Sequence, residues 1–142
     1  MTVPEGFAPH FRKSGFTDPW EPLYSRTLED RIQIGLVADE AHTNSRGFVH
    51  GGLITALADN AMGLSCAVHL EDIGGLVTVN LVTDFVASGQ KGAWLLFNSE
   101  VIKVGRKLCF AQCLVTADDK PIARASATFS VISGQDARRS AA

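Results

Sequence analysis

The sequence predicts an α+β domain in which one long buried helix is followed by antiparallel strands. Three observations predict this class. The chain has 142 residues, the usual length of a single domain, and 46% of them are hydrophobic, which is enough for a real core. Residues 50–70 form one long and almost uniformly apolar stretch. Residues 75–131 consist of β-type segments separated by short turns.

The elements follow the chain in a simple order. A strand region covers residues 28–38, where apolar and polar residues alternate, with a break near Glu29 and Asp30. The long helix covers residues 50–70 and leaves no polar face, so other structure must surround it. Strands are then expected at 75–86, 93–104, 108–117 and 123–131. Short turns between consecutive strands predict an antiparallel meander.

The chain divides into an arm, a domain and a tail. Residues 1–23 are rich in proline and aromatic residues. We expect an arm that packs on the domain as a short helical lead-in, with Phe7 and Phe11 on one face. Residues 24–134 form the domain, and residues 135–142 are expected to be a disordered tail.

Charge and cysteine content exclude several classes of protein. Thirteen basic and fifteen acidic residues give a net charge of −2, which offers no electrostatic footprint for nucleic acid and no polybasic membrane anchor. The three cysteines, Cys66, Cys109 and Cys113, lie in apolar runs, which predicts reduced core thiols. Cys66 and His69 lack the further ligands of a zinc site, so no metal is expected. With no secretory leader at the N-terminus, we expect a cytoplasmic protein.

A membrane span is the alternative interpretation of the apolar stretch. Asp59 and Asn60 fall near its centre, where a charge costs at least about 2.5 kcal/mol on insertion scales. A buried helix in a protein without membrane contact is therefore the favoured interpretation.

The start of this helix carries groups suited to carbonyl chemistry. Gly51 and Gly52 permit close approach of a ligand, and the helix N-terminus beyond them offers unpaired N–H donors to a developing oxyanion. Asn44 and His50 add neutral polar groups, and Asp59 is the only formal charge between Gly51 and Val68. A Gly-Gly pair, a histidine or a lone buried carboxylate can each be structural, but together they indicate a site.

The motif is specific enough to carry a resemblance. Residues 42–52 read H-x-N-x-x-G-x-V-H-G-G, and residues 57–63 read L-A-D-x-A-x-G. From Trp20 to Ile132 the chain resembles the hotdog-fold acyl-CoA thioesterases of the PaaI type. The resemblance implies a long central helix wrapped by a curved antiparallel sheet, active sites shared by two subunits, and hydrolysis of coenzyme A thioesters without a cofactor. Asn80 stands where the family often has an acidic residue, and Ser88-Gly89 replaces a frequent proline.

The resemblance also implies roles for individual residues. Asp59 corresponds to the catalytic carboxylate, acting as general base or nucleophile. Gly51 corresponds to the residue whose N–H polarises the thioester carbonyl, with Gly52 beside it in the substrate site. His50 and Asn44 correspond to residues that orient the thioester and the attacking water. Thr78 aligns with a hydroxyl residue near the carboxylate.

The helix geometry agrees with a shared site. Gly51 and Asp59 are eight residues apart, or about 12 Å along the helix axis. A donor and a carboxylate that act on one carbonyl must both lie within about 3.5 Å of the reacting atoms. Two antiparallel helices related by a two-fold axis satisfy this condition. We therefore expect a homodimer. With the resemblance we also expect a homotetramer built as a dimer of dimers.

The phosphates of coenzyme A need cations. Arg106 and Lys107, with Lys103 nearby, form the best local cluster, and Arg46 is a further candidate; all can equally be solvated turn charges. A serine hydrolase is disfavoured because the chain has no G-x-S-x-G elbow. The remaining alternative is a non-catalytic acyl-CoA-binding or sensor protein of the same fold.

Overall fold

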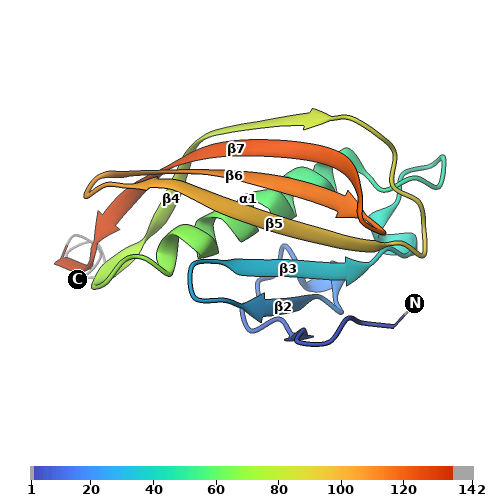
Figure 1. Ribbon diagram of the computed structural model, residues 1–142, viewed down its shortest axis with the longest axis horizontal. Coiled ribbons are helices and arrows are strands. Elements are labelled where there is room, and N and C mark those ends of the chain that lie inside the picture. Colours follow the sequence, from blue (N-terminus) through green and yellow to red (C-terminus); the bar gives the residue numbers. More distant parts are fainter. Residues whose placement is uncertain (1, 136–142) are drawn as a thin grey trace.

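A curved antiparallel sheet wraps one long helix, as the computed structural model of residues 2–135 describes (Figure 1). The helix, α1, spans Gly51–Ala67. Seven strands form one sheet in the order β1-β2-β3-β5-β6-β7-β4. The predicted fold class, an α+β hotdog arrangement, is confirmed. The strands are β1 (Ala8–Pro9), β2 (Tyr24–Thr27), β3 (Ile32–Val37), β4 (Ile73–Phe85), β5 (Trp94–Val104), β6 (Leu108–Ala117) and β7 (Lys120–Ser133).

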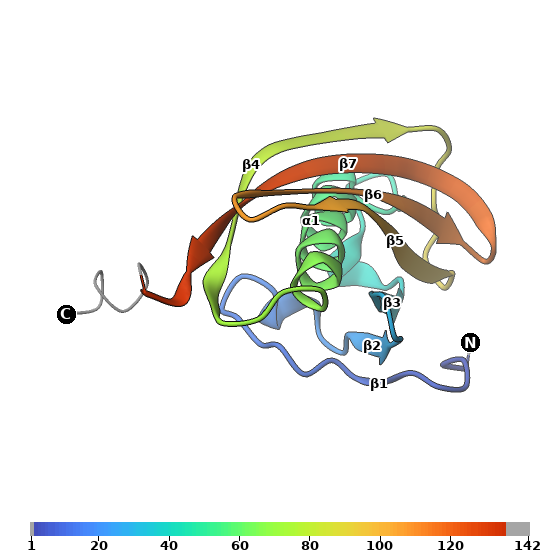
Figure 2. The same ribbon diagram turned by 60° about the vertical axis from the view of Figure 1, so that its left-hand side comes forward.

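The helix is enclosed because its apolar residues do not leave a polar face. Leu57, Ala58, Ala61 and Met62 have no exposed surface. The side chain of Ser65 ties α1 to β3, since its hydroxyl accepts from the Ile32 N–H at 3.1 Å and donates to the Ile32 carbonyl at 3.2 Å. In Figure 2 the helix lies inside the hollow of the sheet. No helix in residues 2–135 is both long and apolar enough to cross a bilayer.

The meander prediction is right for three strands and wrong for one. β5, β6 and β7 pair consecutively through short turns. β4 does not pair with β5; it pairs along its length with β7 and forms the edge of the sheet. The segment that follows β4 instead crosses to the opposite edge of these strands, and the N–H groups of Val86 and Ala87 both donate to the Ile122 carbonyl. β5 then pairs with β3.

The region before the helix holds more β structure than expected. The strand region predicted at 28–38 begins with the turn that the Leu28 N–H closes by donating to the Arg31 carbonyl, and continues as the strand β3. A further strand that was not predicted, β2, precedes the turn and pairs antiparallel with β3. The expected helical lead-in around Phe7 and Phe11 is wrong. Residues 8–9 are instead the short strand β1, which pairs with β2, and within residues 2–23 the only helical turn is a 3₁₀ turn at Asp18–Trp20.

The arm is held to the domain by aromatic packing. The Phe7 ring meets the Trp94 ring edge-on at a centroid distance of 5.1 Å. Trp94 in turn lies against Gly35 of β3, where an added Cβ would fall 2.2 Å from the indole. The arm then passes beneath α1 toward the start of β4 (Figure 2). The predicted tail falls outside the described residues from 136 onward.

Candidate active site

The loop that leads into the helix is anchored by His42. Its Nδ1 accepts a hydrogen bond from the Asp39 N–H at 2.9 Å, and its Nε2 lies 2.9 Å from the Trp20 carbonyl. Both bonds form only when the ring is neutral and carries its proton on Nε2. The His42 carbonyl accepts from the His50 N–H at 2.8 Å. Buried His42 thus joins the arm, the loop and the first residue before α1.

Asn44 shapes the tip of the same loop. Its Oδ1 accepts from the N–H groups of Arg46, at 2.9 Å, and Phe48, at 3.2 Å. Gly47 completes the turn with a φ of +83°, in the left-handed region that favours glycine. The side-chain oxygen of Asn44 therefore holds the loop, and it is the amide Nδ2 that offers hydrogens to a ligand.

At the helix start, His50 is the N-cap residue. Its Nδ1 accepts from the Gly52 N–H at 2.8 Å, so this predicted substrate donor is engaged within the chain. The Gly51 N–H belongs to the first helical residue and has no intrahelical acceptor. Phe85 lines the approach to it, since a Cβ on Gly51 would lie 3.0 Å from the tip of the Phe85 ring.

Asp59 is half-buried on α1 and is paired with Thr78. The Thr78 hydroxyl donates to Asp59 Oδ1 at 2.7 Å. A bulge in β4 at Val79, between the pairs Thr78–Phe129 and Asn80–Thr128, shifts the alternation of the strand by one residue. Thr78 and Thr83 are an odd number of residues apart, yet the bulge lets both face α1, where Thr55 donates to Thr83 at 3.1 Å.

The described structure places the two halves of the candidate site at different points along β4. Thr78 meets Asp59, Thr83 meets Thr55, and Phe85 meets Gly51, so β4 runs antiparallel to α1. Within one chain, Gly51 and Asp59 remain separated by the helical spacing of about 12 Å. A single chain therefore brings together Asp59 and Thr78, and separately His50, Gly51 and Gly52.

A pocket of about 470 Å³ opens beside Asp59. The second half of α1, the start of β4 and Phe129 of β7 form most of its wall. Four arm residues complete the wall: His10, Arg12, Ser14 and Thr17. No local sequence pattern links these arm residues to a helix that begins at residue 51, so the arm was not predicted to be part of the site.

Within one protomer, the predicted cations lie toward opposite ends of the candidate site along α1. Arg46 is exposed in the loop before α1, with its guanidinium 5.8 Å from the centre of the Phe48 ring. Arg106 and Lys107 are exposed in the turn between β5 and β6. The Lys107 carbonyl accepts from the Val131 N–H, and Val131 is paired with Leu76 of β4, two residues from Thr78. Arg46 thus lies near the Gly51 end, and the turn lies near the Asp59 end.

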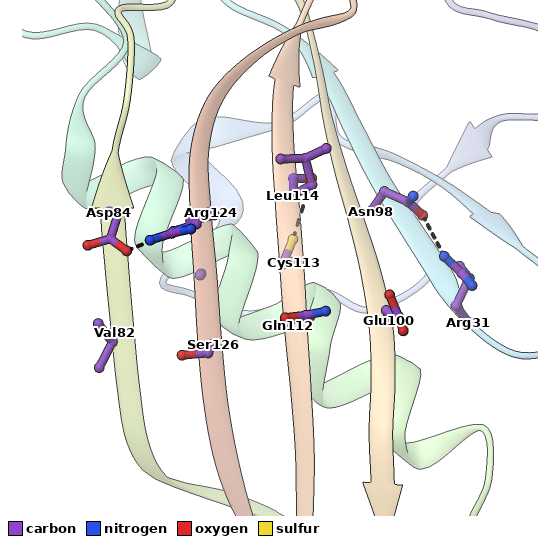
Figure 3. A pocket seen from close by; sticks show the side chains of 11 residues that line it. Arg31, Val82, Asp84, Asn98, Glu100, Gln112, Cys113, Leu114, Arg124 and Ser126 are labelled. Carbon is purple, nitrogen blue, oxygen red and sulfur yellow. Dashed lines mark hydrogen bonds and ion pairs between the residues drawn. The ribbon is translucent and has the colours of Figure 1, made fainter.

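A second hollow of about 550 Å³ lies on the face of the sheet turned away from α1. Figure 3 shows its polar side chains, including the ion pair of Arg124 with Asp84 and the hydrogen bond of Arg31 with Asn98. It contains none of the predicted site residues. The pocket that holds Asp59 is therefore the candidate active site.

Thiol and metal chemistry find no support in the described residues. Burial raises the pKa of the Cys66 thiol to about 12 and that of Cys113 to about 11, which keeps both protonated at neutral pH. Residues 2–135 contain no cluster of three or more histidine, cysteine or acidic side chains that could hold a metal ion. The acidic residue of α1 that lines the pocket is Asp59.

Comparison with known proteins identifies the family of the chain. The family model described as "Thioesterase superfamily" matches residues 46–123. The Pseudomonas aeruginosa protein "Putative esterase PA0474" is 37% identical over 130 residues, which cover 91% of this chain and 97% of that protein. Mouse acyl-coenzyme A thioesterase 13 is 26% identical over 106 residues, covering 67% of this chain and 74% of that protein.

Solved structures show the same fold. Zebrafish thioesterase superfamily member 2 superposes with a TM-score of 0.77 at 24% identity, covering 84% of this chain and 88% of that one. A hypothetical thioesterase from Streptococcus pneumoniae, solved with coenzyme A, superposes with a TM-score of 0.73 at 20% identity, covering 80% and 91%.

The helix wrapped by a curved antiparallel sheet is the hotdog fold, and the match to the thioesterase superfamily, with acyl-coenzyme A thioesterases among the relatives, makes the protein a thioester hydrolase. The chain belongs to the thioesterase superfamily.

Proposed function

We propose that this protein hydrolyses acyl-CoA thioesters, with Asp59 as the general base or nucleophile and the Gly51 N–H as the donor to the thioester oxygen. The observation that carries the proposal is the Asp59 carboxylate, held by Thr78 at the wall of a pocket. The names of the relatives and the coenzyme A in a structural neighbour support acyl-CoA as the substrate class.

The active unit in this proposal is a homodimer formed through β4. This strand is thirteen residues long and lies at the edge of the sheet, so its outer N–H and C=O groups can pair with another strand. Val77, Val79, Val82 and Phe85 are each about half exposed on it. Antiparallel pairing of β4 with its copy would continue the sheet across a two-fold axis and cover this apolar edge.

The contacts along β4 give the register of that pairing. Gly51 lies at Phe85, and Asp59 lies at Thr78. For Gly51 of one chain to meet Asp59 of the partner, Phe85 must face the region of the partner's Thr78. In an antiparallel pair the axis then falls midway, between Leu81 and Val82. The same operation brings Arg46 of one chain toward Arg106 and Lys107 of the other, which is how these cations could hold one coenzyme. A homotetramer would then be a dimer of such dimers.

The chemistry follows from the placement of each group. The thioester oxygen accepts the Gly51 N–H, and the positive end of the helix dipole favours the negative charge that develops there. As a base, Asp59 takes a proton from water while the water oxygen attacks the carbonyl carbon. As a nucleophile, Asp59 attacks that carbon itself, and water then cleaves the resulting anhydride. In both routes the C–S bond breaks, and the thiolate of coenzyme A leaves and takes up a proton.

The test is thiol release from a panel of short, medium, long and aromatic acyl-CoAs, with Asp59→Asn beside the wild type. We expect turnover that is lost by about 10²–10⁴-fold in Asp59→Asn, the usual effect of removing a general base. Acyl-CoA binding should persist in that variant. Asp84→Asn, an exposed carboxylate of the same strand, is the matched control and should retain activity. Binding without turnover by the wild type would favour the non-catalytic alternative.

A further inference from the structure

The pocket beside Asp59 follows the second half of α1. Its helical wall consists of residues that share one face of the helix, because they are spaced by one, three or four positions: Asp59, Asn60, Gly63, Leu64 and Ala67. From Asp59 to Ala67 this face extends about 12 Å along the helix axis. The pocket volume of about 470 Å³ lies within the usual range of about 300–1,000 Å³ for small-molecule sites. A thioester that reacts at Asp59 therefore has an elongated space beside its carbonyl.

Gly63 lies in the middle of this helical face. It is one turn beyond Asp59, or about 6 Å along the axis. Glycine destabilises the interior of a helix relative to alanine, because it loses more backbone freedom on folding. A glycine at this position of α1 therefore has a packing or functional reason.

Packing within one protomer does not require a glycine there. The residue is helical, and beyond its own helix an added Cβ would meet, within residues 2–135, only the Phe129 ring at 3.4 Å, an ordinary van der Waals contact. Gly35 is the opposite case, since a Cβ there would fall 2.2 Å from the Trp94 indole. Phe129 and Gly63 both line the pocket. What the missing side chain of Gly63 does is keep open the space between α1 and Phe129.

The surroundings of Gly63 suit a hydrocarbon chain that runs along the helix. Leu64, Ala67, Leu76 and Phe129 give this side of the pocket an apolar lining, whereas the arm supplies polar residues to the wall. Each methylene group that an acyl chain buries on an apolar lining strengthens binding roughly 4-fold. An acetyl group ends close to the reacting carbonyl, whereas a longer chain reaches Gly63 and gains these contacts.

We propose that the acyl group runs along α1 from Asp59 toward Ala67, and that the missing side chain of Gly63 admits acyl chains of medium length. This inference rests on the proposed thioesterase function and names its substrate class, the medium-chain acyl-CoAs. Gly63 is a specificity-determining residue and takes no part in bond breaking.

The test compares acetyl-, hexanoyl- and decanoyl-CoA. We expect kcat/KM of the wild type to rise by at least about 10-fold from acetyl to hexanoyl, because the longer chain buries several methylene groups. Gly63→Leu fills the space beside Phe129 and should lower the hexanoyl-to-acetyl ratio by at least about 10-fold. Gly63→Ala should lower it less while raising the melting temperature by about 2–4 °C, since alanine favours the helix. Instability cannot then explain the change in specificity.

Ala67→Leu tests the direction of the chain. Ala67 lies one turn beyond Gly63, so this variant should lower the decanoyl-to-hexanoyl ratio more than the hexanoyl-to-acetyl ratio. The control is Gly15→Leu, at an exposed arm residue outside the pocket lining where an added Cβ meets nothing within 4 Å. It should keep both wild-type ratios. A larger effect of Ala67→Leu than of Gly63→Leu on the hexanoyl-to-acetyl ratio would contradict the proposed direction.

Two kinetic results would overturn the proposal: no rise from acetyl to hexanoyl in the wild type, or an unchanged ratio in Gly63→Leu. If Gly63→Leu does not fold, Gly63→Ala and Ala67→Leu decide the matter. A dimeric wild type with monomeric Gly63 variants would assign the missing side chain to subunit packing and would also overturn it. If no thioester is hydrolysed, the proposed function fails, and calorimetric Kd values test the pocket alone. A preference for hexanoyl-CoA over acetyl-CoA that falls in Gly63→Leu would then support it, and an equal preference would end it.

Discussion

The Thr78 hydroxyl on β4 donates a 2.7 Å hydrogen bond to Asp59 Oδ1 on α1. The bulge at Val79 allows this contact together with a similar one between Thr55 and Thr83 further along the strand. The hydrogen bond fixes one carboxylate oxygen of Asp59, and both residues line the pocket. Thr78 is therefore a positioning residue for the proposed reaction.

Replacing Thr78 by valine should lower kcat by about 10-fold or more, because a hydrogen bond to a charged group contributes about 1.5–3 kcal/mol. KM should change little, since the hydroxyl acts through Asp59. Valine keeps the shape of threonine, so the melting temperature reports any effect on folding. Thr83→Val removes the equivalent contact to Thr55 and should leave kcat near the wild-type value. Equal losses in the two variants would show that the hydroxyls of β4 act on the fold and not on Asp59.

The proposed dimer predicts a sensitive position at Val82. This side chain is half exposed on the outer face of β4, next to the expected two-fold axis. Val82→Lys would place two like charges close together in the dimer, so we expect dissociation and loss of most activity. Light scattering after size exclusion measures the mass. Leu28→Lys, in the turn between β2 and β3, should leave the mass unchanged. A Val82→Lys dimer with full activity would contradict pairing through β4.

How far the sequence predicts this structure depends on how local each signal is. The helix and the lone charge at Asp59 follow from an almost unbroken apolar stretch and a compact motif within residues 42–63, although the helix is shorter than the predicted 50–70 and His50 is its N-cap. The pairing of β4 with β7, and of β1 with β2, depends on contacts between segments far apart in the chain, so short turns and alternation did not predict it. Thr78 came from the resemblance, whereas nothing in the local sequence connects His10 with Asp59.

Buried His10 also predicts a pH dependence of stability. Because burial lowers its pKa in the folded state, the unfolded chain binds a proton more readily, and the free energy of unfolding should fall as the pH drops below about 6.5. His10→Phe should lack this part of the decrease. Chemical denaturation between neutral and mildly acidic pH measures both curves. Parallel curves for the wild type and His10→Phe would show that His10 does not titrate differently in the folded state.

The proposed contact between Arg106 and the phosphates of coenzyme A predicts a different kinetic effect. Arg106→Ala should raise KM more than it lowers kcat, because a phosphate contact remote from the carbonyl contributes mainly uniform binding. The effect should shrink as salt is added. Arg124→Ala removes an exposed cation on the outer face of the sheet and is the matched control. Equal KM values for Arg106→Ala and the wild type at low salt would assign Arg106 to the solvated surface.

The central claim is that each site combines the Gly51 N–H of one chain with Asp59 of the other. Gly51→Pro removes that N–H with little other change. Proline is accepted at the first helical residue, and His50 before it is extended, with a ψ of 132°. The added Cβ meets only the tip of the half-exposed Phe85 ring. Gly51→Pro and Asp59→Asn should each be nearly inactive alone.

The decisive measurement mixes Gly51→Pro and Asp59→Asn chains by co-refolding, with heterodimers verified by mass, and records kcat per site. In a mixed dimer one site collects both defects and the other collects neither. Random pairing makes half of the dimers mixed, so we expect recovery to about a quarter of the wild-type kcat under two-fold symmetry. Verified heterodimers that stay as inactive as their parents would contradict the shared site and place the whole reaction within one chain.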